Sequence, residues 1–258
     1  NATFTNLGSS SLGIANNTTD YVYTYASGAK LLSYFNVEQF NITGTSYIDY
    51  ITGYGGNDTI KGGAGGDYLY GVAGDDVLNG EDGNDVIDGG AGNDIIDGGI
   101  GNDTIDGGTG IDIITGGEGN DIIASGIKGE TVDGGAGNDT LTTLNLSDSS
   151  ANLVLDLTAA NQLSGDSSTT IKNFETIASV TTGSGNDTFK LTGNLLISGG
   201  KFDGGTGNDL LIADFSNATF TNLGSSSLGI ANNTTDYVYT YASGAKLLSY
   251  FNVEQFNI

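Results

Sequence analysis

The sequence predicts an all-β chain folded as a right-handed parallel β-roll, a solenoid of short stacked strands. Three observations support this prediction. Glycine supplies 44 of the 258 residues without the three-residue period of collagen. A nonapeptide pattern runs unbroken over residues 44–142. Each nonapeptide also carries one acidic and one aliphatic position. Helix is not expected there, because glycine within a helix costs about 1 kcal/mol relative to alanine.

The acidic position is the sixth residue of the nonapeptide. Eleven consecutive nonapeptides carry it, among them GYGGNDTIK, GEDGNDVID and GGAGNDIID. The acidic residues are Asp49, Asp58, Asp67, Asp76, Asp85, Asp94, Asp103, Asp112, Asp121, Glu130 and Asp139. Two isolated nonapeptides further along, TGSGNDTFK and GGTGNDLLI, add Asp187 and Asp209.

The aliphatic position is the eighth, from Ile51 in the first nonapeptide to Leu141 in the last. Side chains alternate along a strand, so a short strand centred on this position turns one side chain inward and its neighbours outward. Glycines at the first, second and fourth positions permit a tight turn. One nonapeptide therefore makes half a coil. Two of them return the chain above itself and build two parallel sheets around a thin aliphatic core.

The charge balance narrows the partners. The net charge is −24, and all seven basic residues are lysine. Nucleic acid and anionic membranes need a basic surface, so we expect neither as a partner. No apolar run is long enough to span a bilayer. Carboxylates held at close range repel one another, so this composition calls for a cation.

The nonapeptides resemble GGxGxDxUx, the repeat of the RTX (repeats-in-toxin) family. The resemblance implies a parallel β-roll in which each calcium ion lies between two turns stacked on the same edge. Backbone carbonyls and the two position-six carboxylates would hold the ion. Oxygen-only ligands in flexible, carbonyl-rich sites favour calcium over magnesium.

Transferred to this chain, the resemblance implies about nine calcium sites between carboxylates two nonapeptides apart. The pairs on one edge are Asp49–Asp67, Asp67–Asp85, Asp85–Asp103, Asp103–Asp121 and Asp121–Asp139. The pairs on the other edge are Asp58–Asp76, Asp76–Asp94, Asp94–Asp112 and Asp112–Glu130. Lys128 replaces a turn glycine beside Glu130, and Tyr47 replaces one beside Asp49, so those two sites are expected to be weaker. Asp187 and Asp209 are candidates without a partner two nonapeptides away.

A longer repeat encloses the short one. Asn217–Ile258 repeats Asn1–Ile42 letter for letter. This identity indicates recent duplication within a long array, or a window of sequence that overlaps its neighbour. We expect five segments, namely a β-rich segment without metal (1–43), the β-roll (44–142), a second interruption (143–181), isolated RTX-type turns (182–216) and the start of the next period (217–258).

Both interruptions are expected to be β-rich, and they resemble stretches of cyanobacterial RTX-like surface proteins. Alternating residues predict strands at 21–25 and 153–157, with a hairpin turn at 26–29. The tyrosines at 21–25 are a carbohydrate platform or simply packing. Outward-facing Val77, Ile95 and Ile113 should form an apolar ridge that receives the interruptions or contacts a neighbouring chain.

No enzyme is expected, because histidine and cysteine are absent and no catalytic motif is found. The leading hypothesis is a calcium-dependent structural repeat of a secreted extracellular fibre, sheath or surface layer that assembles with copies of itself. For RTX proteins the resemblance implies type I secretion. The alternative is a rigid spacer, or a ligand-binding module of an adhesin that recognises cell-surface polysaccharide.

Overall fold

The computed structural model describes residues 12–15, 21–24, 30–33, 39–124, 129–192, 200–214, 228–231, 236–240, 246–251 and 255–257. Every regular element in this part of the chain is a strand, which confirms the all-β prediction. The chain forms two compact units. Unit 1 contains Asn1–Ser125 and Thr131–Asp139, and unit 2 contains Gly126–Glu130 and Thr140–Ile258.

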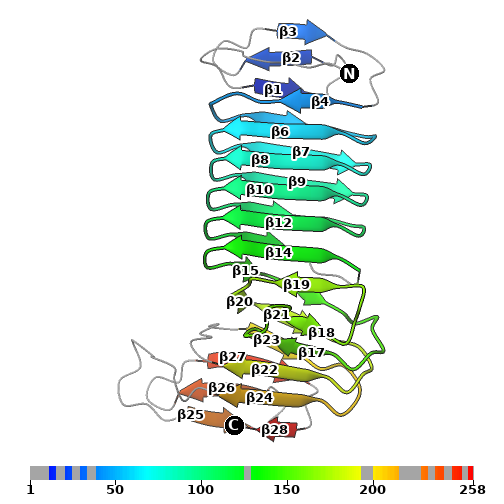
Figure 1. Cartoon of the computed structure of the whole chain (residues 1–258), viewed down its shortest axis with the longest axis vertical. Helices are drawn as coiled ribbons and strands as arrows, with labels where there is room; N and C mark the ends of the chain where they lie inside the picture. The colour runs from blue at the N-terminus through cyan, green and yellow to red at the C-terminus, as the bar shows by residue number, and fades with distance from the viewer. Residues whose placement is uncertain are drawn as a thin grey trace. The chain divides into compact units, whose positions relative to one another are not determined.

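Unit 1 is a parallel β-roll with two sheets (Figure 1). One sheet contains β4 (Asn41–Thr43), β6 (Thr59–Ala64), β8 (Val77–Asp82), β10 (Ile95–Ile100), β12 (Ile113–Glu118) and β14 (Thr131–Ala136). The other contains β5 (Tyr50–Thr52), β7 (Tyr68–Ala73), β9 (Val86–Ala91), β11 (Thr104–Asp106) and β13 (Ile122–Ala124). Neighbouring strands pair in parallel two nonapeptides apart, as in Ile96 opposite Ile114, so the predicted coil is confirmed.

The strands of unit 1 are longer than the short strands predicted. Most run for six residues, from the seventh position of one nonapeptide to the third of the next, as β6 does. The ladder continues past the expected end because the turn backbones also stack. The N–H of Ala64, for example, donates to the carbonyl of Thr45 at 2.9 Å. Stacked turns satisfy the polar backbone groups that a turn would otherwise leave for water.

The predicted aliphatic core is confirmed. Every position-eight side chain from Ile51 to Leu141 is at most 1% exposed. Position seven faces outward on both sheets. Val77, Ile95 and Ile113 are 42%, 49% and 50% exposed and lie side by side in register, so they form the predicted apolar ridge.

Unit 2 also stacks parallel strands, but its spacing is irregular. β17 (Val154–Asp156), β22 (Thr188–Thr192) and β24 (Leu210–Asp214) are neighbours, with Leu155 opposite Phe189 and Phe189 opposite Leu211. β16 (Leu144–Asn145), β21 (Ser179–Thr181) and β23 (Gly200–Asp203) pair likewise. The successive coils along β17–β22–β24 therefore span 34 and 22 residues. The remaining strands of this unit's coils are β15 (Thr140–Leu141), β18 (Leu163–Ser164), β19 (Thr170–Lys172) and β20 (Thr176–Ile177).

Three phenylalanines join the aliphatic residues in the core of unit 2. Phe174, Phe189 and Phe202 are at most 1% exposed, and the rings of Phe189 and Phe202 meet edge to face at 5.4 Å. The buried side-chain amide of Gln162 bonds to the backbone of Phe174 as a neighbouring strand would. Its Nε2 donates to the carbonyl of Phe174, and its Oε1 accepts from the N–H of Phe174. An edge-to-face ring pair of this kind adds to the stability gained from burying the rings.

The two copies of the repeated terminal segment fold alike. The first forms an antiparallel meander of β1 (Leu12–Ala15), β2 (Tyr21–Thr24) and β3 (Lys30–Ser33). The second forms β25 (Leu228–Ala231), β26 (Asp236–Thr240) and β27 (Lys246–Phe251), followed by β28 (Gln255–Asn257). Strands predicted at 21–25 and 153–157 appear as β2 and β17. The predicted hairpin turn at 26–29 lies outside the described residues.

Candidate metal centre

The position-six acids are buried without exception. All the predicted candidates, from Asp49 to Asp209 and including Glu130, are at most 1% exposed. Each aspartate immediately precedes a strand, so its place is fixed by the inward aliphatic residue two positions later. A solvated acidic face would leave these groups in water. Their burial argues against that interpretation, because a buried charge is stable only when it is paired or bound to a metal.

One carboxylate oxygen of each aspartate has a structural role. Asp67 Oδ1 accepts a hydrogen bond from the backbone N–H of Asp49 at 2.8 Å, and Asp85 Oδ1 accepts one from Asp67 at 2.7 Å. The same contact, at 2.7 to 2.9 Å, links further acids 18 residues apart: Asp58–Asp76, Asp76–Asp94, Asp85–Asp103, Asp94–Asp112, Asp103–Asp121 and Asp121–Asp139. Eight of the nine predicted pairs, all except Asp112–Glu130, thus lie on adjacent coils.

The other carboxylate oxygen has no hydrogen-bond partner in most of these residues. It is Oδ2 of Asp58, Asp67, Asp76, Asp85, Asp94, Asp103 and Asp121, and it is buried in each case. A buried carboxylate oxygen without a donor is costly unless a cation faces it.

The unpartnered oxygen lies beside a backbone carbonyl of the next coil. A Cβ built on Gly80, at position one, would lie 2.2 Å from Asp85 Oδ2 and 2.3 Å from the carbonyl oxygen of Gly98. A Cβ on Gly62 would meet Asp67 Oδ2 and the Gly80 carbonyl in the same way, at 2.4 and 2.7 Å. Carboxylate and carbonyl oxygens therefore converge on a small space that only glycine leaves open. This donor set fits a hard cation such as calcium.

The turn glycines have two separate requirements. Backbone φ is positive at the second and fourth positions, for example 110° at Gly63 and 132° at Gly65. Position-one glycines have no positive φ and are needed for space alone. In three nonapeptides without glycine at position two φ is still positive, at 86° in Tyr54, 79° in Val72 and 71° in Glu81, but not at Thr45.

Burial raises the pKa of several position-six acids, which favours their protonated form. It raises the pKa of Asp67 and Asp103 to about 7, and that of Asp58 and Asp76 to about 6. The backbone hydrogen bond to each carboxylate works in the opposite direction, and neighbouring carboxylates raise the pKa further. Without a cation the ionised stack is therefore unfavourable at neutral pH.

No group of three or more acidic side chains comes together as a metal site within the described residues. A cation at one of the predicted sites would therefore need backbone carbonyls beside its two carboxylates. Asp49 differs from the other acids of unit 1, because its Oδ2 accepts a hydrogen bond from the N–H of Thr45. Glu130 is buried but belongs to unit 2, whereas Asp112 belongs to unit 1; Lys128 lies outside the described residues.

The structure supplies the partner that Asp187 and Asp209 lacked. The N–H of Asp187 donates to Asp209 Oδ1 at 2.7 Å, and the N–H of Leu153 donates to Asp187 Oδ1 at 2.8 Å. Asp187 Oδ2 is buried without a hydrogen-bond partner. The pairing thus matches that of unit 1 but at spacings of 22 and 34 residues. The shared letters Gly-x-Gly-Asn-Asp before both strands were the available signal, and the assumption of a fixed spacing concealed it.

A second polar ladder, at position five, was not predicted. Asn84 Oδ1 accepts a hydrogen bond from the N–H of Asn102 at 2.8 Å, and the chain of contacts continues through Asn120 to Asn138. Asn152, Asn186 and Asn208 repeat it in unit 2. These amides hold successive turns in register beside the acids. The recurrence of asparagine in every second nonapeptide was its signal.

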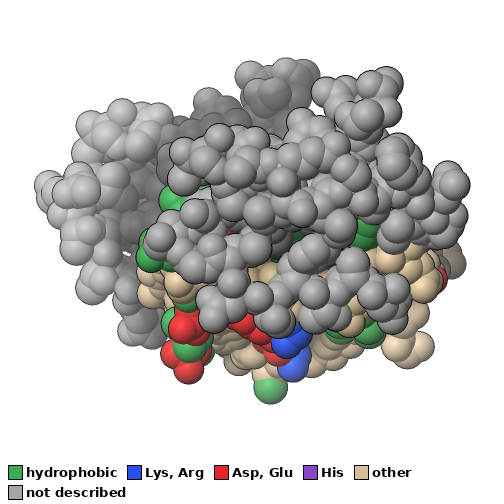
Figure 2. Space-filling model, turned by 90° about the horizontal axis from the view of Figure 1, so that it is seen from above, with side chains coloured by type: hydrophobic (Ala, Val, Ile, Leu, Met, Phe, Trp, Pro, Cys, Tyr) green, Lys and Arg blue, Asp and Glu red, His purple; other side chains and the backbone are tan. Residues whose placement is uncertain are grey.

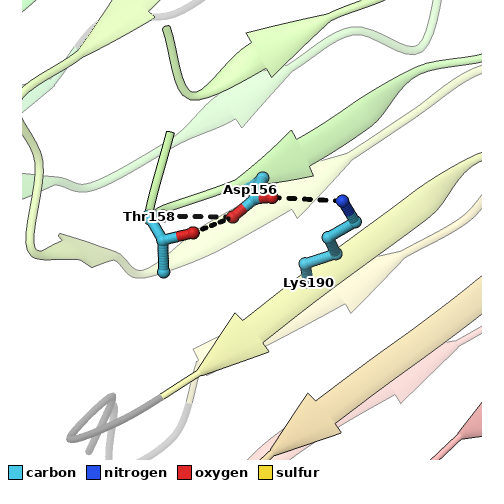
Figure 3. Close-up of polar contacts among 3 residues, drawn as sticks. All are labelled: Asp156, Thr158 and Lys190. Atoms are coloured by element: carbon cyan, nitrogen blue, oxygen red, sulfur yellow. Dashed lines mark hydrogen bonds and ion pairs between the residues drawn. The ribbon is translucent and has the colours of Figure 1, made fainter. Parts of the chain in front are cut away.

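The outward-facing acids at position nine have different neighbours in the two units, so their pKa values shift in opposite directions. At position nine of unit 1, Asp88 lies opposite Asp106, and burial followed by the charge of Asp106 raises the pKa of Asp88. In unit 2 the corresponding Asp156 accepts hydrogen bonds from Thr158 and pairs with Lys190 at 3.2 Å, which lowers its pKa (Figure 3). Figure 2 shows acidic side chains beside hydrophobic ones on the described part of the visible face.

This geometry defines a class of protein, a β-roll whose stacked turns present buried carboxylate and carbonyl oxygens to divalent cations. Residues 43–78, 70–105, 97–127 and 128–145 match the family model described as RTX calcium-binding nonapeptide repeat (4 copies). The repeat segment is therefore a member of the RTX calcium-binding nonapeptide family, and its cation is calcium. No curated protein matches the chain.

Proposed function

We propose that the chain is a calcium-dependent structural repeat of an extracellular fibre, sheath or surface layer. The observation that carries this proposal is the unpartnered, buried Oδ2 that recurs on successive coils. As ligands we propose the eight position-six pairs within unit 1, from Asp49–Asp67 to Asp121–Asp139, with Asp187–Asp209 added as a pair in unit 2. The Asp49 site is the weakest proposed member of unit 1, because Thr45 already occupies its Oδ2.

The mechanism follows from the electrostatics of the stack. Closely spaced carboxylates that are ionised and buried oppose folding, and the chain has few basic residues to offset them. Calcium supplies the missing charge, so its binding free energy becomes folding free energy. Extracellular calcium modules bind at roughly 10⁻⁴ to 10⁻³ M, far above cytosolic calcium. Such a chain would stay unfolded inside the cell, which suits type I secretion, and become rigid outside.

Other features support a structural over a catalytic role. A β-roll of RTX nonapeptides is typical of structural modules, and the acids of the stack are proposed here as calcium ligands rather than as catalytic groups. No helix in the described part of the chain could span a membrane. The exposed ridge of Val77, Ile95 and Ile113 offers an apolar contact for a second copy in lateral assembly.

Circular dichroism during a calcium titration, followed by chelation, tests the mechanism. The strand signal should rise cooperatively with calcium and be lost on chelation. A complete strand signal in chelator would refute calcium-driven folding. Light scattering at high calcium tests assembly separately, and strictly monodisperse monomers there would count against a fibre but not against folding.

A second candidate is a ligand-binding module of an adhesin. The rings of Tyr50 and Tyr68 stack at 4.6 Å with an interplanar angle of 3°, and Tyr50 is 38% exposed. A flat exposed aromatic pair suits a sugar ring. A glycan array in calcium would show saturable binding that a Tyr50→Ala variant loses, with Tyr47→Ala as the exposed control. A glycan array without hits would count against the ligand-binding module and leave the structural repeat as the proposed function.

A further inference from the structure

The two identical meanders use opposite edges to join their neighbours. In the first copy β1 pairs in parallel with β5, which follows it in the sequence, and β3 ends the sheet among the described strands. In the second copy β27, the counterpart of β3, pairs in parallel with the preceding β23, and β25, the counterpart of β1, ends the sheet. The edge that is open in one copy is thus occupied in the other.

The strand that follows the meander also pairs with a later strand in the first copy and with an earlier strand in the second. In the first copy β4 pairs with β6, with Ile42 opposite Ile60. In the second copy β28 pairs with β24, with Phe256 opposite Leu211. Phe256 is the counterpart of Phe40, two positions before Ile42, so both registers keep the same face inward. Phe40 and Ile42 are in fact both buried in the first copy, at 6% and 0% exposure.

We infer that the repeated terminal segment is a joint shared by two successive periods, which it binds simultaneously through its two edges. In an array, one sheet would run from β23 through β27, β26 and β25 to β5 of the next period. The other would run from β24 through the strand at residues 39–43 to β6. The segment would carry both sheets of the solenoid from one period into the next.

The physical reason is the exposed sheet edge. An open strand edge presents unpaired N–H and C=O groups and invites association with other chains. When both edges of the meander are occupied, no sheet edge remains between periods. The free energy of unfolding of the array then includes a contribution from each interface between periods. The inference rests on the proposed function only in taking the chain as part of an array.

The test is a chain in which residues 1–216 precede residues 1–258, so that one internal segment faces both neighbours. The sequence has no cysteine, so introduced pairs report specific contacts. Lys201→Cys of the first period and Ser33→Cys of the second probe the upstream contact, because Ser249, the counterpart of Ser33, lies opposite Lys201. Asn41→Cys and Thr59→Cys of the second period probe the downstream contact.

In calcium, both disulfides should form within the same molecule, as read by mass spectrometry of the intact chain and of its peptides. The control replaces Thr59→Cys by Val77→Cys, which lies one strand further along the same ladder and is out of disulfide range. Formation of only one disulfide per molecule, or of neither, would overturn the joint.

Circular dichroism on the same chain separates the two proposals. If calcium folds the chain and only one disulfide forms, the joint is wrong and calcium-driven folding stands. If strand signal and both disulfides are complete in chelator, the joint stands and calcium-driven folding is wrong.

Discussion

Unit 1 and unit 2 use the same turn at different spacings. In both, the N–H of one position-six residue donates to the Oδ1 of the next, but the spacing is 18 residues in unit 1 and 34 and 22 in unit 2. Leu153 occupies a position in unit 2 that an aspartate fills in unit 1, and phenylalanines join the aliphatic core. We therefore expect coils with an acid at every turn to depend on calcium, and coils with fewer acids, held by apolar burial, to depend on it less.

The largest effect is expected from closing the space beside a carboxylate. Gly80→Ala places a Cβ 2.2 Å from Asp85 Oδ2 and 2.3 Å from the Gly98 carbonyl. We expect a loss of about 1–3 kcal/mol in unfolding free energy in calcium, with a lower bound calcium count. Thermal unfolding and equilibrium dialysis measure both. Gly55→Ala is the matched control, since nothing lies within 4 Å of its Cβ. Equal effects of the two variants would contradict the proposed site.

A smaller effect is expected from Asp103→Asn, which should weaken calcium binding but favour folding in chelator. The amide keeps an oxygen for the N–H of Asp85 but removes the charge. Calcium affinity at the affected turns should fall by roughly tenfold or more, comparable with loss of an outer-shell partner. In chelator at pH 8 the variant should be the more folded of the two chains, because it buries one carboxylate fewer. Isothermal calorimetry and circular dichroism give the two results. Asp82→Asn, on the exposed surface, should change neither.

Acidification should partly replace calcium in unit 1. Folding raises the pKa of Asp67 and Asp103 from 3.8 to about 7. The protonated acids therefore favour the metal-free fold fully below about pH 4, and this contribution is lost as pH rises through 7. The calcium-free chain should gain strand signal between pH 8 and pH 5, and the calcium midpoint should rise over the same range. A metal-free strand signal that falls on acidification would contradict the assignment.

The smallest effect is expected at the ion pair of unit 2. Lys190→Met removes the cation beside Asp156, whose side chain is 22% exposed. Unfolding free energy should fall by only about 0–1 kcal/mol, as for other surface pairs. The pKa of Asp156 should rise towards its usual value while remaining lowered by Thr158. Carboxyl NMR titration reads this directly. A pKa of Asp156 unchanged by the substitution would assign the whole shift to Thr158.

Features that recur in every nonapeptide could be predicted from the sequence. Features that depend on coil length or on the room around a residue could not. The recurrence of residues like Asp67 and Leu69 in every nonapeptide was enough to place one in the stacked turn and the other in the core. The Asp187–Asp209 pair escaped prediction because the chain between them departs from the nonapeptide length. The separate roles of Gly62 and Gly63 were also hidden, since a sequence does not tell whether glycine is needed for space or for positive φ.

Position two shows how much irregularity the stack can carry. Tyr54, Val72 and Glu81 hold a left-handed backbone that costs roughly 1–2 kcal/mol in a residue with a Cβ. These three coils keep that conformation without glycine, whereas Thr45 at the same position of the first nonapeptide has no positive φ. This position is therefore open to mutational drift, and glycine at any of the three is a simple route to a more stable β-roll. For materials built from such repeats, new side chains at position two belong on these three coils, because a Cβ on Gly90 would lie only 2.4 Å from the carbonyl oxygen of Val72.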